Sequence, residues 1–139
     1  MGVEKLLLIG SERVEKSFWQ TPLLKEAAIA EQLELGLEQA KATQFPEVML
    51  CPNWREFIKH QLPAIAASTT HKIIAHPGST DKAAQLASGT TILCIGPEGG
   101  FVDTEVKQIL ELGFTQVHLG ERILRVETAI PVLLAKLFE

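Results

Sequence analysis

Short runs of β-branched and other apolar residues alternate along the chain with longer stretches in which apolar residues recur every three or four positions. The short runs predict strands over residues 5–9, 48–51, 72–75, 90–95 and 114–119. Strands that alternate with helices are typical of an α/β domain with a largely parallel sheet. The fourth run is the most apolar, which predicts the middle strand of a sheet that is covered on both faces.

The longest helical stretch begins at Pro22, a residue that suits the first turn of a helix. Its periodicity predicts one buried face, made of Leu23, Ala27, Ala30, Leu33, Leu37 and Ala40. A shorter helix is expected after Asn53 as its cap, with Trp54 and Phe57 in the core rather than on a base-stacking platform. Two more are expected, one over residues 81–87 and one from an Asp103 cap to Gly113.

The last helical stretch, which runs to Phe138, is apolar nearly all round. Such a helix is buried on more than one side, and in so small a domain a second copy of the chain can supply the second side. We therefore expect a homodimer through the C-terminal helix. Pro131 fits this helix only if it begins close to Thr128, so that the proline falls in its first turn.

The composition excludes several classes of protein. With 139 residues, 46% of them hydrophobic and 22% charged, the chain is expected to be one soluble globular domain over residues 1–139. Its net charge of -4 argues against a protein that holds nucleic acid by bulk charge, so any RNA contact must be local or come from another domain. No apolar run approaches the roughly 20 residues that span a bilayer, so we expect a cytoplasmic protein without membrane contact.

The cysteines do not suggest a metal or redox site. Cys51 and Cys94 each lie in an apolar run, where a free cysteine behaves as a small hydrophobic residue. No Cys-x-x-Cys spacing or nearby histidine pair is present in the sequence, so no metal is expected.

Three loops that follow predicted strands are the candidate binding site: residues 76–78, 96–101 and 120–125. Ligands of open parallel sheets bind outside the carboxyl ends of the strands. In the second loop the glycines let the main chain approach a ligand closely, and Pro97 stiffens the turn. A phosphate site is disfavoured here, because neither phosphate-loop glycine pattern is present and Glu98 would repel a phosphate.

Charged residues near the third loop add a second indication of a site. Arg122, Arg125 and Glu127 lie among apolar residues, where charged groups need a ligand or a structural ion pair. His76 precedes Pro77 at a strand end, and its backbone is a better candidate for ligand contact than its ring. Arg13 and its neighbours are interpreted as a solvated loop with an apolar anchor rather than an RNA contact.

Two sequence blocks resemble the paired signature of a known family. Residues 95–101 read Ile-Gly-Pro-Glu-Gly-Gly-Phe, and residues 119–129 read Leu-Gly-Glu-Arg-Ile-Leu-Arg-Val-Glu-Thr-Ala. Both are similar to blocks of the bacterial ribosomal RNA small subunit methyltransferase E family, and Gly2-Val3 with Ser11-Glu12-Arg13 resembles the start of its catalytic domain. The resemblance covers essentially the whole chain. Family members carry an N-terminal RNA-binding barrel of the PUA type before this segment, which the 139 residues do not include, and RNA affinity is expected to reside largely there.

The resemblance implies an S-adenosylmethionine-dependent enzyme of the SPOUT class that methylates N3 of a uridine in 16S ribosomal RNA. It implies a parallel-sheet α/β fold with a C-terminal trefoil knot, a homodimer, and the small ribosomal subunit RNA as substrate. The three loops are expected to form the knot crevice, with the cofactor's adenine against Leu119, Ile123 and Leu124. The residues expected at the cofactor are His76, Pro77, Ile95, Gly96, Pro97, Glu98, Gly99, Gly100, Leu119, Gly120, Ile123 and Leu124.

The same resemblance suggests catalytic roles for three residues. Methylation at N3 of uracil requires loss of the N3 proton and in-line attack on a sulfonium methyl, which depends mostly on positioning and electrostatics. Arg125 is expected to stabilise the uracil oxygens, and Arg122 to contact an RNA phosphate or the cofactor carboxylate. Glu127 is either a base or a structural partner of an arginine. Two other readings stay open: a non-catalytic dimeric assembly module and a nucleotide-binding protein.

Overall fold

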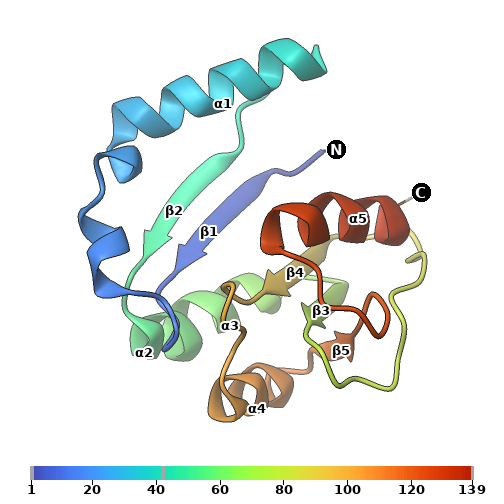
Figure 1. Ribbon diagram of the computed structural model, residues 1–139. Helices are drawn as coiled ribbons and strands as arrows, with labels where there is room; N and C mark the ends of the chain where they lie inside the picture. Colours follow the sequence, from blue (N-terminus) through green and yellow to red (C-terminus); the bar gives the residue numbers. More distant parts are fainter. Residues whose placement is uncertain (1, 42, 139) are drawn as a thin grey trace.

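The computed structural model describes residues 2–41 and 43–138, and it is an α/β fold built on parallel strands (Figure 1). β1 (Lys5–Ile9) pairs with β2 (Glu47–Cys51) in a two-stranded sheet. β4 (Thr91–Ile95), β3 (His71–Ala75) and β5 (Thr115–Val117) form a three-stranded sheet in that order. Every pairing between these strands is parallel, as the alternation of strands and helices predicts.

The middle strand of the larger sheet is β3, so the prediction for residues 90–95 is wrong. Ile73 and Ile74 of β3 are both buried, and Ile74 lies opposite Cys94 of β4. Apolar content alone did not separate these two strands, because β4 is apolar from Ile92 to Ile95 although only Cys94 in it is buried. β5 is shorter than residues 114–119 suggest.

The helix expected over residues 81–87 is absent, and this segment is irregular apart from one bridge residue. Lys82 forms an isolated parallel bridge with His118, and the amide of Ala83 donates to the carbonyl of His118 at 2.9 Å. Farther along, Leu86 donates to the carbonyl of Leu137 at 2.9 Å. The segment therefore satisfies its backbone groups with the end of β5 and with the C-terminal helix, which overrides its local helical pattern.

The long helix differs from its prediction in start and burial. Pro22 begins a 3-10 turn (Pro22–Leu24) that follows another (Lys16–Gln20), and the extended backbone of Lys25 separates these turns from α1 (Glu26–Ala40). No described residue of α1 is buried, so the predicted buried face is wrong. Figure 1 shows the reason: α1 lies at the outer edge of the molecule beside the two-stranded sheet, away from the larger sheet.

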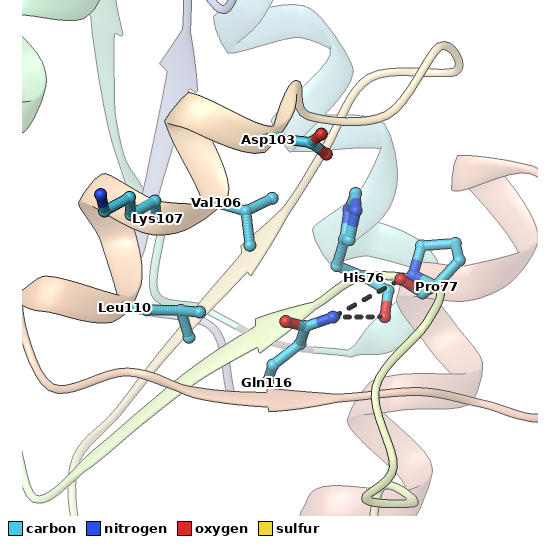
Figure 2. A pocket seen from close by; sticks show the side chains of 7 residues that line it. All are labelled: His76, Pro77, Asp103, Val106, Lys107, Leu110 and Gln116. Carbon is cyan, nitrogen blue, oxygen red and sulfur yellow. Dashed lines mark hydrogen bonds between the residues drawn. The ribbon is translucent and has the colours of Figure 1, made fainter.

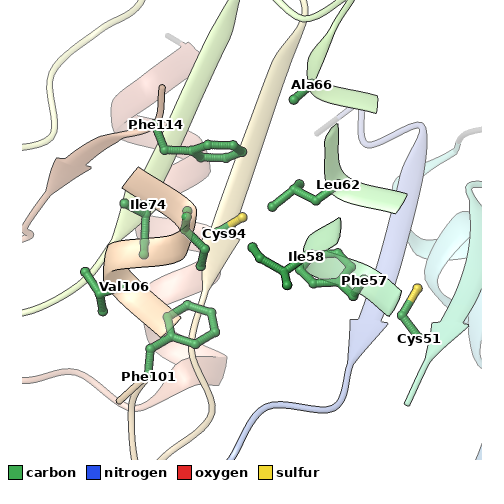
Figure 3. Packing of buried hydrophobic residues seen from close by; sticks show 11 residues of the cluster. Cys51, Phe57, Ile58, Leu62, Ala66, Ile74, Cys94, Phe101, Val106 and Phe114 are labelled. Atoms are coloured by element: carbon green, nitrogen blue, oxygen red, sulfur yellow. The ribbon is translucent and has the colours of Figure 1, made fainter. Parts of the chain in front are cut away.

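Residues 54–66 form one helical run made of α2 (Trp54–Glu56), a π turn (Phe57–Gln61) and α3 (Leu62–Ala66). The predicted Asn53 cap is confirmed, because its Oδ1 accepts from the amide of Glu56 at 3.2 Å. This run fills the main core, where it packs with β3, β4 and α4 (Figure 3). The labelled core side chains include Phe57, Leu62, Ile74, Cys94, Phe101 and Phe114.

Both cysteines are buried and free, which agrees with their interpretation as small hydrophobic residues. Burial raises the pKa of the Cys94 thiol to about 12, so the thiol stays protonated and unreactive. Among residues 2–41 and 43–138, no group of three or more His, Cys, Asp or Glu side chains is placed to hold a metal ion. None of the helices in the same ranges has the length and apolar content to cross a membrane.

α4 (Asp103–Glu111) begins with Val102 as its cap rather than Asp103. The carboxylate of Glu105, in the first turn, accepts from the amide of Val102 at 3.0 Å. This contact satisfies a donor at the helix start and moves the cap one residue earlier than expected. Gly113, with φ +83, follows the C-cap as predicted, a conformation that glycine adopts without steric cost.

α5 (Val126–Phe138) begins two residues before Thr128, so Pro131 lies inside the helix instead of in its first turn. Because proline has no amide hydrogen, the helix loses one backbone hydrogen bond there. Leu133 and Leu137 are buried, whereas Ile130 is 39% and Phe138 49% exposed. A single copy of the chain thus buries Leu133 and Leu137 and leaves the apolar side chains of Ile130 and Phe138 exposed beside them.

Candidate ligand-binding site

The loops after β3 and β4 meet an N-terminal residue that the sequence did not assign to the site. Arg13, in the loop after β1, donates from Nη1 to the carbonyl oxygen of Gly99. A Cβ placed on Gly99 would lie 3.1 Å from Arg13 Cδ, and one on Gly100 would lie 3.9 Å from Arg13 Nη1 and 3.8 Å from His76 Cε1. The Arg13 guanidinium and the His76 ring therefore both lie next to the glycine-rich turn.

His76 also lines an open pocket of about 350 Å³ between the end of β3, β5 and α4 (Figure 2). The pocket is lined by His76, Pro77, Asp103, Val106, Lys107, Leu110 and Gln116. Four of these seven residues are polar, and they come from the end of β3, from α4 and from β5.

The main chain of His76 is already engaged within the fold. Its amide donates to the carbonyl of Val117 at 3.0 Å, and the carbonyls of His76 and Pro77 each accept from Gln116 Nε2 at 3.5 Å (Figure 2). The ring, rather than the backbone amide, is the part of His76 that faces the charged groups of the site.

The charge state of His76 is set by its surroundings. Burial of the ring lowers its pKa below 6.5, the carboxylate of Asp103 opposes this by raising it, and the Arg13 cation lowers it further. The imidazole is therefore neutral at pH 7, with one ring nitrogen able to accept a hydrogen bond.

A hydrogen bond joins the second candidate loop to the end of the third. The Glu98 carboxylate accepts from the amide of Val126, the first residue of α5, at 3.1 Å. A carboxylate at this position satisfies a free donor and lies favourably in the field of the helix N-terminus. Gly120, with φ +138, starts the turn that leads to this junction. The structure thus brings the loops of residues 96–101 and 120–125 together.

The third loop does not have the apolar surroundings that the sequence suggested. Arg122 and Arg125 are exposed, Ile123 is 82% exposed, and Leu124 is exposed as well. Arg125 Nη1 lies 3.9 Å from Glu127 Oε1 in an exposed ion pair, the kind that contributes little to stability. Of the three apolar residues expected at the adenine, only Leu119 is half-buried. The exposed side chains of Ile123 and Leu124 are free to contact a ligand or another chain.

Close packing explains the glycine at position 96. A Cβ there would lie 2.9 Å from the Phe101 amide nitrogen, so the turn cannot hold a larger residue without moving. Phe101 is 2% exposed and anchors the other end of the turn in the core. Ile95 and Pro97, on either side of Gly96, are half-buried.

Two residues of this region were missed at the sequence level. Arg13 is separated from Gly99 by 86 positions, so no local pattern announces their contact. Glu105 is 4% exposed and takes a second hydrogen bond from the amide of Glu12 at 2.7 Å. Only its position three residues after Val102 is a sequence signal, because glutamate is favoured there in a capping box.

Parallel strands whose following loops meet around a glycine-rich turn are typical of α/β domains, whose ligands bind outside the carboxyl ends of the strands. Comparison with known proteins makes the class more specific. The family model described as RNA methyltransferase domain matches residues 1–138. The chain therefore belongs to the RNA methyltransferase domain family.

Relatives named ribosomal RNA small subunit methyltransferase E match most of the chain. One from Treponema pallidum is 30% identical over 132 residues, which are 93% of this chain and 50% of that protein. One from Borreliella burgdorferi is 25% identical over 93% of this chain and 53% of that protein. The chain thus spans about half the length of these relatives.

Solved structures share the fold. The ribosomal RNA small subunit methyltransferase E of Neisseria gonorrhoeae, bound to S-adenosyl methionine, has a TM-score of 0.66 and 27% identity over 96% of this chain and 55% of that one. A putative methyltransferase of Legionella pneumophila, in complex with the cofactor SAM, has a TM-score of 0.60 and 26% identity over 94% of this chain and 54% of that one.

Proposed function

We propose that this chain is the methyl-transferring domain of an S-adenosylmethionine-dependent enzyme that acts on N3 of a uridine in 16S ribosomal RNA. The observation that carries the proposal is the Glu98–Val126 hydrogen bond, which brings the two loops with the family's signature residues together. Membership of the RNA methyltransferase domain family and two solved relatives with the cofactor support the same chemistry.

The residues present fit the cofactor on two structural observations. The turn of Gly96, Gly99 and Gly100 exposes main-chain groups without side chains, and a Cβ at Gly96 would disturb it. Leu124 and Ile123 offer uncovered apolar surface that suits an adenine. We assign cofactor binding to the main chain of the three loops and to this apolar surface. When bound, S-adenosylmethionine supplies an electrophilic methyl group on a sulfonium.

The arginines near α5 provide the electrostatics for the nucleic-acid substrate. Loss of the N3 proton spreads negative charge over the uracil oxygens, and we assign Arg125 to stabilise that charge. Arg122, two residues after Gly120, is free to contact a phosphate or a carboxylate. Glu127 lies within 3.9 Å of Arg125, which supports a role in orienting that arginine. The target base must be unpaired or flipped to enter such a site.

The proposal includes the C-terminal trefoil knot and the homodimer of the family. Hydrogen bonds at both ends of α5 hold this helix to distant segments of the chain, which supports the proposed knot. The Val126 amide donates to Glu98, and the Leu137 carbonyl accepts from the Leu86 amide. The exposed apolar side chains of α5, Ile130 and Phe138, support pairing with a second copy. Such pairing would also cover part of the exposed third loop, which adjoins the start of the helix.

Calorimetric titration with S-adenosylmethionine tests the proposal, together with transfer of a labelled methyl group to 16S ribosomal RNA. We expect saturable binding, methyl transfer to uridine N3, and a loss of at least about a hundredfold in turnover for Arg125→Ala. Arg55→Ala, on exposed α2, is the control for removal of a positive charge. A stable dimer that does not bind S-adenosylmethionine would indicate an assembly module, and preference for ATP a nucleotide-binding protein.

A further inference from the structure

Arg13 is an exposed arginine whose side chain is held in place at the candidate site. One of its five N–H donors bonds to the carbonyl oxygen of Gly99. Within residues 2–41 and 43–138, no carboxylate forms an ion pair with it. The guanidinium therefore keeps several free donors beside the glycine-rich turn.

The backbone segment that carries Arg13 is held by contacts to the end of β2 and to α4. The Gly10 amide donates to the carbonyl of Cys51 at 2.8 Å, and a Cβ on Gly10 would lie 2.1 Å from the Pro52 oxygen. The Glu12 amide donates to the buried Glu105 carboxylate at 2.7 Å. This segment is therefore positioned against β2 and α4 before any ligand arrives, so less conformational entropy is lost when Arg13 binds one.

The ligand chemistry follows from charge and location. The chain has a net charge of -4, and Glu12 and Glu15 lie on the same segment, so bulk attraction does not bring RNA here. Arg13 is the cation next to Gly99 and Gly100, while Asp103 lies across the turn beside His76. A planar guanidinium with free donors matches the oxygens of a phosphodiester better than an ammonium does.

We infer that Arg13 binds a backbone phosphate of the substrate RNA next to the nucleotide that enters the site. Its hydrogen bond to Gly99 holds the guanidinium beside the glycine-rich turn. The inference rests on the proposed function for the identity of the substrate. It adds a substrate contact from the N-terminal half of the chain to a site otherwise built from the C-terminal half.

The test measures binding of a fluorescein-labelled single-stranded oligouridine by anisotropy at several salt concentrations. One phosphate contact contributes about 0.7 to the slope of log affinity against log salt for single strands. We expect Arg13→Gln to lower the slope by that amount and to weaken binding about tenfold. Arg13→Lys, which keeps the charge, retains the slope. Glutamine also keeps an N–H donor for the Gly99 carbonyl, which separates loss of charge from loss of the anchor.

Arg55→Gln serves as the matched control, because it removes one exposed positive charge on α2 and is expected to leave slope and affinity unchanged. Titration of each variant with S-adenosylmethionine, run in parallel, tests the proposed function independently of RNA. A wild-type slope in Arg13→Gln overturns the inference, and so does an equal loss in Arg55→Gln or an absence of RNA binding by the wild-type chain. If the wild-type chain shows no S-adenosylmethionine binding in that titration, the proposed function is contradicted instead.

Discussion

At the scale of single residues, a buried carboxylate connects parts of the chain that are far apart in sequence. Glu105 accepts hydrogen bonds from the amides of Glu12 and Val102 and is 4% exposed. A buried charge is tolerated when its oxygens are satisfied in this way. Glu105 thus ties the segment of Arg13 to the start of α4, which follows the glycine-rich turn.

Removing the charge of Glu105 is expected to destabilise the fold. Glutamine keeps one acceptor oxygen but presents an amide group to a second backbone N–H, so Glu105→Gln is predicted to lower the free energy of unfolding by about 2 kcal/mol. Urea denaturation followed by circular dichroism measures the change. Glu111→Gln, at the exposed end of the same helix, is the control. Equal stability of the two variants would contradict this role.

The lowered pKa of His76 predicts a pH dependence of stability. Because the folded state disfavours the protonated ring, the unfolded state binds this proton first as the pH falls below about 6.5. Stability contributed by His76 is therefore present above pH 6.5 and decreases as the pH falls through that value. The difference in unfolding free energy between wild type and His76→Gln, measured from pH 8 to pH 5, should shrink or reverse toward acid. A difference that stays constant with pH would show that the ring does not titrate abnormally.

At the scale of elements, a side chain from another loop caps the N-terminus of α5. Glu98 accepts from the Val126 amide, and the helix starts there although Pro131 follows within its second turn. The cost of an interior proline is a lost hydrogen bond and a clash with the preceding turn. The contact of Glu98 helps to offset that cost, and it also sets the position of the arginines before α5.

Loss of this cap is expected to loosen the first turn of α5. Glu98→Ala is predicted to reduce stability by about 1 kcal/mol, the usual value for an N-terminal cap. Hydrogen exchange should quicken at the first amides of α5 more than in α4. Glu121→Ala, which removes an exposed carboxylate from the neighbouring loop, is the control. If both variants exchange alike, Glu98 has no capping role in solution.

At the scale of the whole molecule, the chain leaves apolar surface uncovered where a partner is proposed. Ile130 and Phe138 of α5 are exposed, while Leu133 and Leu137 hold the helix in the core. Covering such surface contributes roughly 25 cal/mol for each Å² of apolar area removed from water. α5 therefore carries exposed apolar side chains that the proposed second copy would cover.

A charge on that face is expected to prevent pairing. Ile130→Glu is predicted to weaken self-association at least about tenfold, because an unpaired carboxylate would be buried in the interface. Sedimentation velocity over a range of protein concentrations measures the effect. Leu35→Glu, at a position of α1 that is 50% exposed, is the matched control and should leave association unchanged. Dimerisation of Ile130→Glu at wild-type concentrations would place the interface elsewhere.

Much of the local structure could be predicted from the sequence. The strand at residues 5–9, the Asn53 cap and the end of α4 at Gly113 depend on neighbours within a few positions, and all are confirmed. The candidate loops were found because a strand followed by glycine is a local signal. The family was recognisable for a similar reason, since both of its blocks are continuous in sequence. The roles assigned to individual site residues remain predictions.

Other features were decided by the tertiary structure alone. The order of the strands, the non-helical segment at residues 81–87 and the start of α5 depend on partners such as His118 and Glu98, which lie far away along the chain. The Arg13–Gly99 contact is of the same kind. A periodic pattern reports which face of an element is apolar, but backbone donors and charged groups bond to whichever partner the fold brings near. Sequence thus determined most of the strands and helices and the chemistry they carry, whereas packing decided the rest and determined which groups meet.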